Sequence, residues 1–234
     1  APRFEIEESE GGEREGTLGN PELRPYVAWN GDLSAEWYMS RNGALTVAGF
    51  YKDVRDYIVD VRLQDIELFG VTVDEATVAT NAESATIYGV EVGFSQAWTM
   101  LPAPFDGILT QVNYTWTDAT VDFPIDGDAG ELRESVLPAT SRHTFNASLG
   151  YDKGPVSFRL AGTYRDKYLD EVQAVADEDR YVRQHFQLDA SARFRITPNF
   201  QLFGEWVNIN NAKYVAYQNA PVSRRLLQYE EYSY

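Results

Sequence analysis

The chain has 234 residues and no Cys, and its 36 Asp and Glu against 20 Lys and Arg give a formal net charge of −16 at pH 7. The lack of Cys excludes disulfide bonds and thiolate metal sites in these residues, and the acidic balance argues against a nucleic-acid partner, because phosphates need a basic surface. No run of about 18 apolar residues is present, so the sequence contains no membrane-spanning helix.

Apolar and polar residues alternate with a period of two along most of the chain, which is the pattern of β-strands with one apolar face. The first four predicted strands span about 27–37, 44–61, 88–98 and 108–117. An Asn-Gly turn at Asn42 and Gly43 joins the first two strands as a hairpin. The first half of the chain therefore predicts a meander of antiparallel strands.

The second half continues the same pattern. Four more strands are predicted at 142–152, 156–165, 183–197 and 200–206, and a ninth begins near Leu226. The alternation is clearest from Phe186 to Ile196, where single polar residues such as Gln187 and Asp189 separate the apolar ones. No segment predicts a helix of any length, so we expect an all-β fold.

The connections between these strands alternate in length. Tight turns are expected at 41–43, 101–107, 153–154 and 197–199. Longer, polar and acidic connections are expected at about 63–83, 123–141, 171–181 and 218–225. In an up-and-down meander this alternation puts all tight turns at one end and all long loops at the other. Outer-membrane barrels have this asymmetry, with short periplasmic turns and long extracellular loops.

Strand length and aromatic residues favour a membrane wall over a soluble sheet. Soluble strands average about 5 to 6 residues, whereas the alternation here continues for about 10 to 16, enough for a tilted strand to cross hydrocarbon. Aromatic side chains also stand near both ends of the apolar rows, where such rings meet lipid headgroups. Those by the short turns are Trp37, Trp98, Tyr151, Phe194 and Phe200, and those toward the long loops are Trp29, Tyr114, Trp116 and Tyr164.

We therefore predict an antiparallel up-and-down transmembrane β-barrel wall of about nine strands. The apolar rows face lipid and the polar rows face a wet interior. Because open strand edges do not exist in lipid, these strands form a partial barrel. A large soluble β-sandwich or β-solenoid is the alternative.

Six segments carry a family resemblance. Leu18–Pro25 resembles a GNPxLxPE segment, with Tyr26 where Glu is usual. The other five resemble the FYKDIxDYI, xxxxGxE, LPxxxxHxxN and VxNLxNxxY motifs and the approach to a last strand, and they are Phe50–Ile58, Ala85–Glu91, Leu137–Asn146, Val207–Tyr214 and Arg225–Tyr229. In this order they resemble the C-terminal part of the barrel of a TonB-dependent outer-membrane receptor, a 22-stranded barrel with a plugged lumen.

The resemblance covers residues 1–234 and implies a domain organisation. Residues 1–25 are expected to form an extracellular loop, and the rest to form strands with short periplasmic turns and long extracellular loops. The plug domain and the TonB box are expected to be absent from these residues. The chain would then be the C-terminal portion of the receptor barrel.

The resemblance also implies a function. Such a receptor lies in the outer membrane of a Gram-negative bacterium, in contact with outer-membrane lipid. It takes up a scarce nutrient, here an oligosaccharide or a ferric siderophore, with energy from TonB-ExbB-ExbD acting through the plug and TonB box. The segment Leu226–Tyr229 resembles carbohydrate-type receptors. A passive porin-like channel and a soluble carbohydrate-binding β domain are the alternatives.

Residues near the expected extracellular rim are candidates for ligand binding. Five are basic and expected to point inward, where they could grip an anionic siderophore or an acidic sugar, and four are tyrosines that could stack on sugar rings or planar chelates. They are Arg142, Arg165, Lys167, Arg183 and His185, with Tyr168, Tyr181, Tyr214 and Tyr217. The alternatives are ion pairing with Asp and Glu of neighbouring strands and packing of the tyrosines within the wall.

Catalytic, metal and cofactor sites are not predicted. The chain has two His, His143 on a row expected to face lipid and His185 on a row expected to face the lumen, so no Ser-His-Asp set shares a face. The acidic segment 122–134 has oxygen ligands suited to Ca²⁺, but its spacing matches no EF-hand loop, so a solvated acidic loop is favoured.

Overall fold

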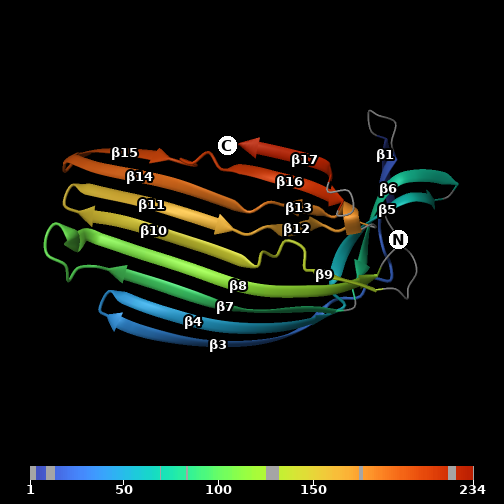
Figure 1. Ribbon diagram of the computed structural model, residues 1–234, viewed down its shortest axis with the longest axis horizontal. Coiled ribbons are helices and arrows are strands. Elements are labelled where there is room, and N and C mark those ends of the chain that lie inside the picture. The colour runs from blue at the N-terminus through green and yellow to red at the C-terminus, as the bar shows by residue number, and fades with distance from the viewer. Residues whose placement is uncertain are drawn as a thin grey trace.

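The computed structural model describes residues 4–8, 14–68, 70–82, 84–124, 132–173, 176–220 and 225–233. Its main element is a nine-stranded antiparallel sheet (Figure 1). In chain order its strands are β3 (Val27–Ser40), β4 (Gly43–Arg55), β7 (Ser84–Ala97), β8 (Ile108–Pro124), β9 (Leu132–Val136), β10 (His143–Lys153), β11 (Val156–Arg165), β14 (His185–Thr197) and β15 (Phe200–Trp206). Each long strand pairs with the next, so the predicted up-and-down wall is confirmed.

The wall continues at one end into a second sheet. Its strands are β12 (Tyr168–Glu171), β13 (Arg180–Val182), β16 (Lys213–Ala220) and β17 (Arg225–Ser233), in the order β12-β13-β16-β17. Figure 1 shows these strands prolonging β11, β14 and β15 beyond the main sheet. The predicted ninth strand near Leu226 is β17.

A third sheet lies at the same end. It contains β1 (Phe4–Glu8), β2 (Arg14–Leu18), β5 (Ile58–Leu68) and β6 (Val71–Asn81), and β2 runs parallel to β6. The segments expected to be loops at 1–25 and 63–83 thus contain strands. We call this end the long-connection end, and the opposite end, at the left of Figure 1, the short-turn end.

The second predicted strand was too long. It ends at Arg55 rather than near residue 61, because Asp56 has a left-handed backbone with φ 54°. The Asn81 side chain donates to the Asp56 carbonyl at 2.8 Å, and the Ala82 amide donates to the Tyr57 carbonyl at 2.6 Å. Since the alternation runs on into β5, the pattern alone does not reveal this break.

One face of the wall carries a row of aromatic side chains toward the long-connection end. The rings of Trp29 and Tyr51 lie 6.1 Å apart, and those of Tyr88 and Trp116 lie 5.7 Å apart. We call this side the belt face and the opposite side the inner face. The pairing of Tyr51 with Tyr88 places both aromatic pairs in one row across four strands.

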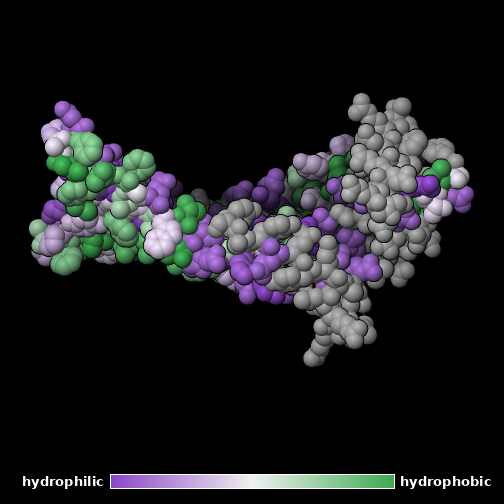
Figure 2. All heavy atoms as spheres, turned by 90° about the horizontal axis from the view of Figure 1, so that it is seen from above, coloured by the Kyte–Doolittle hydropathy of each residue, from purple (hydrophilic) through white to green (hydrophobic). Residues whose placement is uncertain are grey.

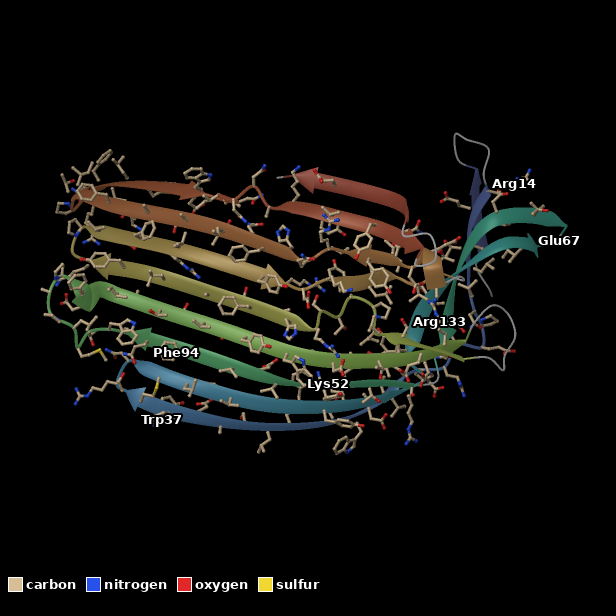
Figure 3. The ribbon with its side chains drawn as sticks, in the orientation of Figure 1. Arg14, Trp37, Lys52, Glu67, Phe94 and Arg133 are labelled. Carbon is tan, nitrogen blue, oxygen red and sulfur yellow. The ribbon has the colours of Figure 1, made fainter. Side chains whose placement is uncertain are left out.

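A second aromatic row crosses the belt face at the short-turn end, where Figure 3 labels Trp37 and Phe94. Between the two rows the side chains are apolar and exposed, for example Leu33 at 80% and Leu149 at 52%. Eight residues separate Trp29 from Trp37, about 26 Å along a strand. This distance matches the lipid-facing band of an outer-membrane barrel, about 25 Å tall.

The inner face is polar in its middle and apolar at the long-connection end. Across four strands the register aligns Asn113 with Asn146 and Thr163 with Gln187, a line of neutral amides and hydroxyls. Toward the long connections a small core closes over this face. Its buried residues are Val54, Ala82, Ala85, Ala119, Val121, Leu137, Leu169 and Val172.

A break in the wall separates β15 from β16. Here Asn208 and Asn211 adopt left-handed φ angles of 56° and 50°. The Asn208 amide donates to Asp189 Oδ1 at 2.8 Å, and its side chain both accepts from the Ala212 amide at 2.6 Å and donates to the Ala212 carbonyl at 3.0 Å.

The Asn210 side chain also forms hydrogen bonds to backbone groups at the break. It accepts from the Leu188 amide at 2.9 Å and donates to the Phe186 carbonyl at 2.7 Å. Side-chain amides therefore replace the backbone bonds that the β14–β15 ladder loses at this point.

Replacing Ala147 with Arg tests which face meets lipid. Ala147 lies in the belt-face row of β10, midway between His143 and Tyr151, so a charge there enters hydrocarbon. We expect the free energy of unfolding to fall by about 2 to 4 kcal/mol, measured by urea titration of the full-length protein in phospholipid vesicles. Ser148→Arg, on the inner face, is the matched control, and an equal loss in both variants would contradict this orientation.

Replacing Asn208 with Ala tests the repaired break. Asn208 is buried, and its loss leaves both the amide and the carbonyl of Ala212 without their side-chain partner. We expect unfolding to become easier by about 1 to 3 kcal/mol, measured in the same titration. Asn199→Ala, in an exposed turn, should change it by less than about 0.5 kcal/mol. Equal values for the two variants would show that the Asn208 side chain does not contribute to the free energy of unfolding.

Candidate ligand-binding site

The four predicted tyrosines lie on the strands of the long-connection end. Tyr181 of β13 pairs with Tyr217 of β16, and their rings stack with centroids 6.0 Å apart. Tyr168 opens β12, and Tyr214 lies near the start of β16. These residues therefore form two groups, the stacked pair Tyr181 and Tyr217 and the neighbours Tyr168 and Tyr214.

Arg165 connects the tyrosine region to a turn of the wall. Its guanidinium lies 3.8 Å from the centre of the Tyr168 ring, a cation–π contact. It also donates to the Ala139 carbonyl at 2.6 Å and to Ser141 Oγ at 2.8 Å. Ala139 has a left-handed φ of 58°, and the Arg165 guanidinium bridges this residue and Ser141. Arg165 thus contacts the wall through a carbonyl, a hydroxyl and a ring, whereas the alternative expected ion pairs with Asp and Glu.

Arg142 lies on the other side of the wall from the expected position. Its guanidinium contacts Asp118 Oδ1 at 2.9 Å, and the Tyr88 hydroxyl donates to Asp118 Oδ2 at 2.9 Å. Asp118 belongs to the belt-face row of Trp116, whereas an inward position was expected. The alternation does not reach Arg142, because this residue precedes β10 and lies outside the strand.

The remaining basic residues have separate surroundings. Lys167 and Arg183 are exposed, and their backbone amides donate to Asp166 Oδ1 and to the Val215 carbonyl. His185 Nδ1 lies 3.3 Å from the Lys213 carbonyl, beside the wall break. The structure therefore does not gather the five predicted basic side chains into one cluster.

A recess of about 310 Å³ lies beside the tyrosines. Its lining comes from the β5–β6 hairpin, β12 and the turn after β9, and comprises Tyr57, Ile58, Asp60, Thr77, Pro138, Asp170, Glu171 and Val172. Figure 3 shows the hairpin, with Glu67 at its far tip, at the same end as Arg133. None of the nine predicted residues lines this recess.

Three carboxylates of the recess were missed by sequence reasoning. Asp170 and Glu171 each contact Arg180 Nη1, at 2.9 and 3.2 Å, while Asp60 reaches the recess from β5. The Asp170-Glu171 pair two residues after Tyr168 was a local signal for part of the site. The sequence around Asp60 gave no such signal, because Asp60 reaches the recess only through the way the β5–β6 hairpin folds back.

The hydroxyls of Tyr214, Tyr181 and Tyr57 have a pKa above the ordinary value and stay neutral at physiological pH. Burial, then the neighbouring Tyr168 and Asp170, raise the pKa of Tyr214 to about 12. Burial is also the main cause that raises the pKa of Tyr181 and of Tyr57. All three groups are therefore available as neutral hydrogen-bond donors or stacking surfaces.

Among the residues that the structure describes, no three His, Asp or Glu side chains are placed to hold a metal ion. Asp126, Asp128 and Glu131 of the acidic segment considered for Ca²⁺ lie outside the described residues. Within the same described ranges, no helix has the length and apolarity to cross a bilayer.

Comparison with known proteins identifies a family model and several solved structures. The family model described as TonB-dependent receptor-like, beta-barrel matches residues 4–210. No curated protein sequence matches the chain. The ferric-catecholate import receptor Fiu from E. coli is similar over 84% of this chain and 25% of its own, with 19% identity and a TM-score of 0.57.

Two further structures share the fold. The copper transporter OprC matches over 82% of this chain and 27% of its own, with 17% identity and a TM-score of 0.60. The siderophore receptor PirA from Acinetobacter baumannii matches over 94% of this chain and 34% of its own, with 14% identity and a TM-score of 0.54. The chain thus spans about a quarter to a third of these proteins.

Titration of Tyr214 tests the site's burial. Because its folded-state pKa is about 12 against an ordinary 10.0, the unfolded chain loses this proton first. The stability it contributes is therefore complete below pH 10 and is lost as the pH rises from about 10 to 12. In the full-length protein, the tyrosinate absorbance difference between wild type and Tyr214→Phe should rise near pH 12. A difference that rises near pH 10 would contradict this.

Proposed function

The chain belongs to the TonB-dependent receptor-like β-barrel family, and from that premise we propose that it forms part of the wall and of the ligand-binding end of an outer-membrane uptake receptor. The match of the family model over residues 4–210 carries this proposal. The receptor takes up a scarce nutrient, with energy delivered by TonB-ExbB-ExbD through a plug and a TonB box.

The wall's role in this function is structural and selective. Its belt face contacts the lipid of a Gram-negative outer membrane, and its inner face bounds the lumen. The exposed apolar band between two aromatic rows supports this arrangement, because such a band matches lipid better than water. A soluble carbohydrate-binding domain would leave the band without a partner. The receptor binds and moves its ligand without covalent chemistry.

We favour an oligosaccharide as the ligand. Sugar hydroxyls donate to carboxylates and amide oxygens, and the recess offers Asp60, Asp170 and Glu171 beside the Tyr57 ring. One line across the middle of the inner face carries neutral amides and hydroxyls, as in the pairing of Asn113 with Asn146. The guanidinium of Arg165 already has wall partners, and Arg180 already pairs with Asp170. This region therefore suits a neutral, hydroxyl-rich molecule.

A ferric siderophore is the second candidate. It is supported by two similar structures, which are a ferric-catecholate import receptor and a siderophore receptor. Lys167 and Arg183, which are exposed at the same end, also offer positive charges to an anionic chelate.

Uptake by the intact receptor tests the proposal. Cells that express it should accumulate a labelled oligosaccharide or ferric chelate, and TonB-deficient cells of the same strain should not. A passive porin-like channel gives equal uptake in both strains, and that result would refute energised transport. Uptake of neither class would refute the receptor function itself.

A charge variant then distinguishes the two ligand classes. Asp60→Ala removes an acceptor of sugar hydroxyls, so we expect the Kd of the purified full-length receptor for the oligosaccharide to rise roughly tenfold. Binding of an anionic ferric chelate should stay unchanged or tighten, because a negative charge is lost. Glu67→Ala, at the tip of the same hairpin, is the matched control and should change neither affinity.

A further inference from the structure

One connection at the short-turn end differs from the others. The turns at 41–42, 154–155 and 198–199 have two residues each, whereas β7 and β8 are joined by residues 98–107. This connection contains six consecutive apolar residues, Met100–Phe105, which we call the apolar turn. In a chain with 24% charged residues, no charged side chain occurs between Gln96 and Phe105.

The apolar turn is exposed. Met100 is 60% exposed, Leu101 36% and Phe105 57%. Figure 2 shows hydrophobic residues gathered at the short-turn end, while the middle of the same view is mainly hydrophilic. A contiguous exposed apolar surface on a folded protein marks a contact with a membrane, another protein or a ligand.

Polar contacts hold the apolar turn in place from both sides. The Asn42 side chain donates to Thr99 Oγ1 at 3.2 Å, which ties its first end to the turn between β3 and β4. At its other end Asp106 forms an ion pair with Lys153, next to the turn between β10 and β11. The apolar surface is thus fixed by its neighbours.

These anchors place the turn beside the belt face. The Trp98 indole donates to Thr110 Oγ1 at 3.0 Å, and Thr110 lies in the belt-face row of β8. A Cβ at Gly107 would lie 3.2 Å from the Tyr151 ring, which belongs to the short-turn aromatic row. The apolar turn is therefore continuous with the surface that faces lipid.

The backbone of the apolar turn also suits a membrane boundary. Pro102 and Pro104 have no N–H group, and the amides of Leu101 and Phe105 donate to Trp98 and Pro102 within the turn at 3.0 and 2.9 Å. Few backbone N–H groups of the turn therefore lack a partner. An N–H group without a partner is what makes irregular backbone costly in lipid.

From these observations we propose that the apolar turn inserts into the adjacent membrane leaflet, at the boundary between headgroups and acyl chains, and anchors the wall there. Its occupant is phospholipid, because the turn continues the lipid-facing belt. A protein partner or a second copy of the receptor would instead cover a surface separate from that belt. Interfacial anchors of this kind reach about 5 to 10 Å into the boundary.

Fluorescence quenching in lipid nanodiscs tests the proposal. An environment-sensitive fluorophore is attached to Phe105→Cys, and in a second variant to Met100→Cys, in the full-length receptor with any other Cys removed. Nitroxide-labelled phospholipid should quench both labels strongly, and aqueous iodide should quench them several-fold less than a label at Asn199→Cys. The Asn199 label reports an exposed turn at the same end.

Two results would overturn the proposal. Iodide quenching equal to that at Asn199 would place the turn in water. Protection from both quenchers would show that protein covers it. A label at Ala147→Cys, in the apolar band, should be quenched by lipid in every case. When lipid quenches the Ala147 label, the wall lies in the membrane. Iodide quenching at Phe105, or protection there from both quenchers, then contradicts insertion of the turn alone.

Discussion

In hydrocarbon, no water replaces a missing hydrogen bond, so every backbone amide and carbonyl of a membrane wall needs a partner within the protein. The antiparallel ladder from β3 to β15 meets this requirement over most of the wall. The need for partners also explains the side-chain hydrogen bonds in the segment between β15 and β16. There the ladder stops, and Asn208, Asn210 and Asp189 supply the missing partners from their side chains. The wall can change direction without leaving unpaired groups.

The same requirement separates the work of the two faces. Since the ladder satisfies the backbone, the belt face needs only apolar and aromatic side chains, and the inner face is free to carry amides, hydroxyls and charges. Charged groups on the belt face are confined to its margin. Asp118 there is compensated by Arg142 and by the Tyr88 hydroxyl.

The wall was predictable from the sequence because a period of two is a local signal. The rows containing Trp29, Val92 or Phe194 follow from neighbouring residues, and so do the turns at Gly43 and Gly154. Contacts between distant segments give no such signal. Asp60 and Asp170 meet in one recess only because a hairpin folds over the wall. Arg142 was placed on the wrong face because it lies just outside a strand, where alternation no longer applies.

The parallel pairing of β2 with β6 has a consequence for assembly. The Asn81 side chain accepts from the Arg24 amide, and this contact closes a loop of 57 residues. Closing such a loop costs chain entropy before any contact is gained, so non-local pairings of this kind form slowly. We therefore expect the hairpin of β5 and β6 to reach its final place after the shorter meander has formed. Docking of this hairpin would then complete the recess, because Ile58, Asp60 and Thr77 line it.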